Sequence, residues 1–159
     1  MGSETLKKLS SLGITEDVIF VDHVFELTLA YYYSSAALLA YPSLYEGFGL
    51  PPLEAMACGC PVVTANTSSL PEVVGEAGIM VNPYDTSSLV QAMRRVLTDD
   101  KLRDNMVRRG LEQSKKFSWE KTAELTLQVY NKVARGGEIE DMAELALLQE
   151  TMEMERRRS

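Results

Sequence analysis

The sequence has few of the residues that build disulfides, metal sites or nucleic-acid interfaces. Its only cysteines, Cys58 and Cys60, are separated by one residue, which is too close for an easy disulfide, and there is a single histidine. We therefore expect no metal site and a reducing, cytoplasmic location. Its 16 Lys and Arg residues are outnumbered by 23 Asp and Glu, and the net charge of −7 argues against nucleic acid as a partner.

Long apolar runs are also missing from the sequence. No stretch approaches the roughly 20 apolar residues of a membrane-spanning helix, so we expect no membrane span. The first residues have neither the basic nor the apolar region of a signal peptide. The chain has 159 residues, 45% of them hydrophobic and 25% charged, as in ordinary globular proteins. This length corresponds to about one domain, which can form a core without disulfides.

Short apolar runs alternate with amphipathic segments along the chain. Such alternation predicts an α/β fold with a parallel sheet of about four strands flanked by helices. Strands are expected at residues 18–21, 36–41, 61–65 and 78–81. Helices are expected at residues 4–12, 25–35, 51–58, 86–98, 100–116 and 118–135, the last capped by Ser118, with one helical turn at 71–74.

The spacing of apolar residues gives two of these helices an expected inner face. Leu27, Ala30 and Tyr31 are expected to point inward from the helix at 25–35. The tyrosine run at 31–33 is interpreted as packing and rim rather than as a stacking platform. Ala123, Leu127 and Tyr130 are spaced for burial in the helix at 118–135.

The segment between strands 36–41 and 61–65 carries the candidate site. Gly47 and Gly49 predict a loop, and Pro51 and Pro52 suit the first turn of a helix. Ligands of open α/β sheets bind outside the carboxyl ends of the strands, where this loop begins. Backbone amides at 47–50 and the start of the helix can bind phosphate oxygens. Glu54, about one turn into that helix, can accept bonds from sugar hydroxyls at the same place.

These residues carry a resemblance to a known family. Glu46 and Glu54 flank the motif Glu-Gly-Phe-Gly-Leu-Pro at 46–51, which resembles the signature of retaining glycosyltransferases of the GT-B fold, family 4 (group 1). The similarity continues through Leu-Pro-Glu-Val-Val at 70–74, Ala-Gly at 77–78 and Phe-Ser-Trp at 117–119. It covers residues 4–134 and implies part of the C-terminal, donor-binding domain, which is Rossmann-like.

The resemblance implies a substrate, a reaction and a set of roles. A glycosyl unit would be transferred from a nucleotide-diphosphate sugar with retention of configuration, without a metal or other cofactor. Glu46, as the catalytic residue, would contact the donor sugar near the transferred carbon. Glu54 would bind the nucleotide ribose. The donor loop, whose amides would bind the sugar and diphosphate, consists of Gly47, Phe48, Gly49 and Leu50.

The sequence also departs from the family pattern. The first two strands of the domain, its Arg and Lys for the leaving diphosphate, and the acceptor domain have no counterpart, so we expect little or no activity from this chain alone. Asp22-His23 replaces the usual glycine after strand 18–21. Without those two strands, strand 18–21 lacks its usual neighbour. It could pair directly with strand 36–41, which we favour. Alternatively, a second chain could take the place of the absent strands, or the fragment could be poorly packed.

Residues 138–159 lie beyond the resemblance, so we divide the chain into a partial donor-binding domain at 1–137 and a helical extension at 138–159. Five apolar residues spaced along this extension predict an amphipathic helix, either solvated or mediating a homodimer (Ile139, Met142, Leu145, Leu148 and Met152). The alternative to a transferase domain is therefore a non-catalytic module that binds nucleotide or associates with itself.

Overall fold

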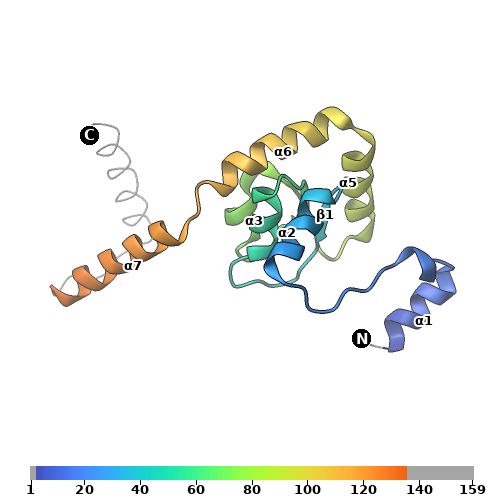
Figure 1. The fold of residues 1–159 in the computed structure, drawn as a ribbon, viewed down its shortest axis with the longest axis horizontal. Coiled ribbons are helices and arrows are strands. Elements are labelled where there is room, and N and C mark those ends of the chain that lie inside the picture. Colours follow the sequence, from blue (N-terminus) through green and yellow to red (C-terminus); the bar gives the residue numbers. More distant parts are fainter. Residues whose placement is uncertain (1–2, 136–159) are drawn as a thin grey trace.

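The computed structural model describes residues 3–135 and has a small parallel sheet at its centre (Figure 1). Its strands β1 (Leu39–Tyr41), β2 (Val62–Ala65) and β3 (Ile79–Val81) lie in the order β1-β2-β3. All strand pairs are parallel, with Leu39 opposite Val62 and Val63 opposite Ile79. The predicted α/β class with helices around a parallel sheet is confirmed, with three strands in the described part of the chain.

Helices cover both faces of this sheet, and β2 supplies side chains to both. Val62 packs with α3 (Leu50–Ala57) and α4 (Leu70–Val74) in one hydrophobic cluster. Val63 packs with α5 (Thr86–Thr98) and α6 (Asp100–Ser114) in the other. Successive side chains of a strand point to opposite faces, so a central strand of a doubly covered parallel sheet is buried on both sides. All four residues of β2 are buried, with Thr64 the polar one among them.

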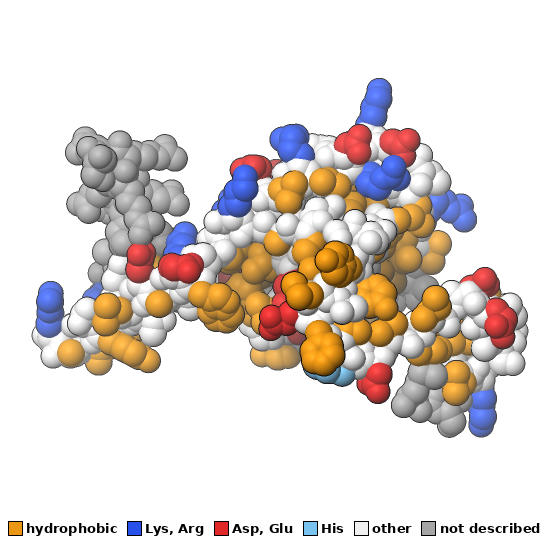
Figure 2. Space-filling view, in the orientation of Figure 1, with side chains coloured by type: hydrophobic (Ala, Val, Ile, Leu, Met, Phe, Trp, Pro, Cys, Tyr) orange, Lys and Arg blue, Asp and Glu red, His pale blue; other side chains and the backbone are white. Residues whose placement is uncertain are grey.

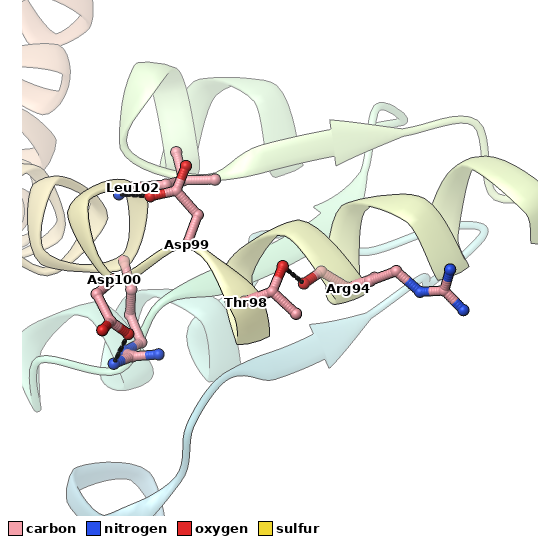
Figure 3. A network of polar contacts seen from close by, with 6 residues as sticks. Arg94, Thr98, Asp99, Asp100 and Leu102 are labelled. Carbon is pink, nitrogen blue, oxygen red and sulfur yellow. Dashed lines mark hydrogen bonds and ion pairs between the residues drawn. The ribbon is translucent and has the colours of Figure 1, made fainter.

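The helices α5 and α6 form where they were predicted because each begins at an aspartate cap. Asp85 Oδ1 accepts hydrogen bonds from the amides of Ser87 and Ser88. Asp99, directly after α5, accepts from the amide of Leu102 at 3.0 Å and starts α6 (Figure 3). These bonds satisfy N–H groups that have no partner within a helix, which fixes the corner between the two helices.

The predicted strand at 18–21 is wrong. This segment is irregular and lies between the 3-10 turn η1 (Thr15–Asp17) and α2 (Glu26–Ser35), so it does not pair with β1. Ile19 is 86% exposed, and β1 has β2 as its only neighbour in the described sheet. A strand forms only where another backbone accepts and donates its hydrogen bonds, and here no neighbour does so.

The expected inner faces of two helices are also wrong. On α2, Leu27 and Tyr31 are 79% and 72% exposed, and Tyr33 is the tyrosine that packs against the core. Helix α7 (Trp119–Ala134), capped by Ser118 as expected, has no buried residue, and its Leu127 and Tyr130 face solvent. Both α1 (Ser3–Leu12) and α7 stand away from the central body (Figure 1). The predicted helix at 138–159 lies outside the described residues.

Candidate functional site

The candidate loop leaves the carboxyl end of β1 after Tyr41 and runs to Gly49, after which α3 begins at Leu50. In residues 3–135, none of the four amides at 47–50 donates a hydrogen bond to the protein. Pro51 and Pro52 have no N–H, and the amide of Leu53 already donates to the Gly49 carbonyl at 3.3 Å. Donors for a ligand at this helix start therefore come from four consecutive residues.

A second loop, between β2 and α4, holds the first one in place. Ser68 Oγ accepts a hydrogen bond from the amide of Glu46 at 3.0 Å. Ser69 Oγ lies 2.7 Å from the Phe48 carbonyl and 3.1 Å from that of Glu46, and its single proton is shared between them. Thr67 Oγ1 donates to the Ser43 carbonyl at 3.2 Å. Ser69 and Thr67 thus bond loop carbonyls and Ser68 bonds the Glu46 amide, while the amides at 47–50 stay available. Sequence reasoning missed them, although the Thr-Ser-Ser run at 67–69 was the signal.

Gly49 fits its place for two physical reasons. Its φ is +108°, a backbone conformation that side chains with a Cβ rarely adopt. A Cβ at this position would lie only 2.9 Å from Leu70 Cδ2, and Leu70 is fully buried. The loop therefore passes directly over α4, and only glycine allows that approach without strain or displacement of the core.

Glu46 is held by a tyrosine that sequence reasoning did not single out. The Tyr41 hydroxyl donates a hydrogen bond of 2.6 Å to Glu46 Oε1. This bond, with a smaller contribution from Ser43, holds the pKa of Glu46 below its ordinary value, because hydrogen bonds to the carboxylate favour its charged form. The same bond is the main cause that raises the pKa of Tyr41 to about 12. Glu46 is therefore a fixed carboxylate that accepts hydrogen bonds.

Glu54 has a similar partner on another element. Tyr33 of α2 donates its hydroxyl to Glu54 Oε2 at 3.4 Å. Burial, followed by the charge of Glu54, raises the pKa of Tyr33 to about 12. Glu54 lies on the exposed side of α3, and no hydrogen bond joins it to Glu46. The structure thus brings Glu46 and residues 47–50 together in one loop, while Glu54 is fixed separately, one turn along the helix.

The part of the chain that the structure describes contains neither a metal-binding cluster nor a membrane-spanning helix. Residues 3–135 contain no group of three or more His, Cys, Asp or Glu side chains placed to hold a metal ion. None of their helices is both long enough and apolar enough to cross a membrane.

Comparison with known proteins places this loop in a family. The family model described as glycosyl transferases group 1 matches residues 2–113, more than half of the chain. The chain belongs to the group 1 glycosyl transferases. The predicted resemblance is thereby confirmed, and the matched region is part of the C-terminal domain of the GT-B fold.

Curated relatives in this family are transferases with different substrates in their names. The O-antigen chain mannosyltransferase B of Escherichia coli is 44% identical over 128 residues, covering 80% of this chain and 34% of the relative. A D-inositol 3-phosphate glycosyltransferase of Nocardioides sp. is 42% identical over 127 residues, covering 78% of this chain and 28% of the relative. The chain thus spans about a third of the length of these glycosyl transferases.

Solved structures agree on the fold. Sucrose-phosphate synthase of Thermosynechococcus elongatus superposes with a TM-score of 0.76 at 31% identity, over 84% of this chain and 34% of that one. The C-terminal domain of a group 1 glycosyl transferase of Francisella tularensis superposes with a TM-score of 0.64 at 27% identity. That match covers 71% of this chain and 60% of the domain, so two fifths of the domain lies outside the match.

Proposed function

We propose that this chain is the nucleotide-sugar-binding part of a retaining glycosyltransferase. The observation that carries the proposal is the run of four unpartnered amides at 47–50, placed at the start of α3 and next to the tyrosine-held carboxylate of Glu46. Amides at a helix start attract anions through their N–H groups and through the helix dipole. A diphosphate is the anion that the family relationship supports.

Each predicted site residue has a role in this proposal. The amides of the donor loop, Phe48, Gly49 and Leu50 above all, bind the diphosphate and the adjoining sugar. Glu46, kept ionised by Tyr41, accepts hydrogen bonds from sugar hydroxyls and stabilises positive charge that develops near the transferred carbon. Glu54, positioned by Tyr33, accepts hydrogen bonds from the ribose.

Calorimetric titration with UDP-, GDP- and ADP-sugars tests the binding site. We expect at least one of them to bind and Glu54→Gln to weaken it about 10- to 100-fold, because hydrogen bonds to a charged group contribute about 1.5–3 kcal/mol. Glu16→Gln, an exposed carboxylate in η1, is the matched control and should leave the dissociation constant unchanged. Failure of every nucleotide sugar to bind would contradict the proposal, and equal binding by Glu54→Gln would remove the ribose role.

We propose further that the isolated chain binds donor without efficient transfer. The family's Arg and Lys for the leaving diphosphate have no counterpart in this sequence, and loss of one such electrostatic donor typically slows a reaction about 100-fold or more. Turnover by the 159-residue chain at a rate typical of enzymes, about 1 per second or faster, would contradict this part of the proposal.

The surface around α2 is proposed to receive the remainder of such an enzyme. Figure 2 shows hydrophobic side chains next to the single histidine. Strand β1 is at one end of the described sheet and so has an unpaired edge. Strands 1 and 2 lie in the middle of the Rossmann strand order, so a strand-helix-strand segment that pairs with β1 is the occupant we propose. Seven large apolar side chains at 19–32 are exposed, namely Ile19, Phe20, Val21, Phe25, Leu27, Tyr31 and Tyr32.

Co-expression tests this docking. The part of the Escherichia coli mannosyltransferase that lies outside its matched region should co-purify with this chain, and Phe25→Ser should prevent it. Leu97→Ser removes a half-exposed apolar side chain from α5 and serves as the control. Sedimentation of the chain alone distinguishes the alternative: a stable homodimer that Phe25→Ser dissociates would show that a second copy occupies the surface instead.

A further inference from the structure

A single aromatic contact joins the donor loop to the linker between α6 and α7. Phe117 lies in that linker, and its ring centre is 5.8 Å from that of Phe48, with the ring planes at 85°. This is the edge-to-face geometry that aromatic pairs prefer. Phe48 is 43% exposed and Phe117 is half-buried, so each ring shields part of the other.

The linker is itself anchored under the donor loop. Gln113, near the end of α6, donates through Nε2 to the Val73 carbonyl of α4 at 3.0 Å. The amide of Phe117 donates to the Ser114 carbonyl at 3.2 Å, which turns the chain back toward the loop. Since α4 also presents Leu70 to Gly49, the end of α6, α4 and the donor loop form one packed unit. The Phe48–Phe117 contact joins the linker to this unit at the protein surface.

Phe48 is therefore restrained at two points while its amide stays available. Ser69 Oγ donates to its carbonyl at 2.7 Å, and Phe117 packs against its ring. We propose that Phe117 is a positioning residue, which orients the Phe48 and Gly49 amides and couples occupancy of the donor loop to the start of α7. This inference rests on the proposed function of the loop, but the orientation of the amides can be measured without a ligand.

The start of α7 provides a natural reporter for this coupling. Trp119 is the only tryptophan of the chain, lies two residues after Phe117 and is 77% exposed. Ser118 between them caps α7 by accepting from the amide of Lys121 at 3.1 Å. Since α7 has no buried residue, its first turn can respond to a shift of Phe117 without breaking core packing. Emission of Trp119 should therefore change when a ligand fills the donor loop.

The experiment compares four variants of the full chain. Phe117→Leu keeps an apolar side chain but removes the ring, Phe117→Tyr keeps the ring, and Tyr130→Leu removes an exposed ring of α7 that is 67% exposed. Phe48→Leu removes the same contact from the other side and guards against a folding defect specific to Phe117→Leu. Amide order parameters at residues 47–50 are measured without ligand. Calorimetry and Trp119 emission then follow titration with GDP and UDP.

We expect Phe117→Leu to lower the order parameters of the Phe48 and Gly49 amides below the value of about 0.85 of rigid backbone. It should also weaken nucleotide binding about 2- to 10-fold, the fold-change that corresponds to loss of one aromatic pair. In Phe117→Leu, the change in Trp119 emission should disappear even when the same fraction of the protein has ligand bound. Phe117→Tyr and Tyr130→Leu should behave like the parent chain.

The outcomes separate this inference from the proposed function. Unchanged order parameters in both Phe117→Leu and Phe48→Leu would overturn the positioning role, whatever the ligands do. A Trp119 response that survives in Phe117→Leu would overturn the coupling. If neither nucleotide nor any nucleotide sugar binds the parent chain, the proposed function fails, and the order parameters alone decide whether Phe117 orients the loop.

Discussion

Gly49→Ala is the most direct test of how the donor loop is held. Gly49 has a φ of +108°, and an added Cβ would lie 2.9 Å from Cδ2 of the fully buried Leu70. A side chain in such a backbone conformation costs about 1–3 kcal/mol, and overpacking a closed core costs about 1–3 kcal/mol more. We therefore expect Gly49→Ala to lower the free energy of unfolding by about 2–6 kcal/mol.

Two other glycines separate the parts of this cost. Gly59 has a φ of +75°, but its added Cβ would meet only Val107 Cγ1 at 3.7 Å, so Gly59→Ala carries backbone strain without overpacking. Gly47 has no atom within 4 Å of an added Cβ and no left-handed φ, so Gly47→Ala should change stability by no more than about 0.5 kcal/mol. Urea unfolding followed by far-ultraviolet circular dichroism measures all three. A cost for Gly49→Ala no larger than that for Gly59→Ala would refute the argument that the loop closes on Leu70.

Three further predictions concern the tyrosines, a helix cap and a closely packed glycine. Burial and carboxylate partners raise the pKa of Tyr33 and of Tyr41 from 10.0 to about 12, so the stability that the neutral phenols contribute is complete below pH 10 and lost as the pH rises toward 12. Spectrophotometric titration should show late ionisation that disappears in Tyr33→Phe and Tyr41→Phe, and ordinary ionisation in the parent chain would contradict it. Asp99→Ala removes the cap of α6 and should cost about 0.5–2 kcal/mol in urea unfolding, whereas Asp99→Asn keeps an acceptor and should cost less; equal losses would exclude a capping role. An added Cβ at Gly78 would lie 2.6 Å from Val74 Cγ1 and 2.7 Å from Val62 Cγ2. Gly78→Ala should therefore cost about 3 kcal/mol or more, and an unchanged melting temperature would show that this packing is wrong.

Local sequence signals predicted the elements whose neighbours are present. The helix at 86–98 was bounded correctly because its apolar residues repeat at helical spacing. The donor loop was visible for a similar reason, since its glycines and prolines are next to one another. The contacts that hold the loop were not visible, because Ser68 and Ser69 bond to residues more than 20 positions away.

The tyrosines show a different limit of sequence reasoning. Tyr33 was interpreted as packing, which the structure confirms, but the same side chain also donates to Glu54 from another helix. Tyr41 belongs to the apolar run of β1, so its hydroxyl carried no pattern of its own. Periodicity identifies which face a residue occupies, whereas a hydroxyl's hydrogen-bond partner depends on tertiary geometry.

The failed strand prediction at 18–21 and the exposed face of α2 have one physical origin. Apolar sequence at these positions encodes burial, yet Ile19, Phe25 and Leu27 are each about four-fifths exposed or more in this chain. Complete burial of such a side chain contributes about 1.5–3 kcal/mol, so the three together leave about 5–9 kcal/mol unrealised, comparable to the net stability of a whole domain. A neighbouring backbone at the edge of β1 would provide both the hydrogen bonds that a strand needs and a surface for these side chains. The apolar side chains that make residues 18–21 resemble a strand therefore also favour association of the surface around α2 with a complementary segment that contains a strand.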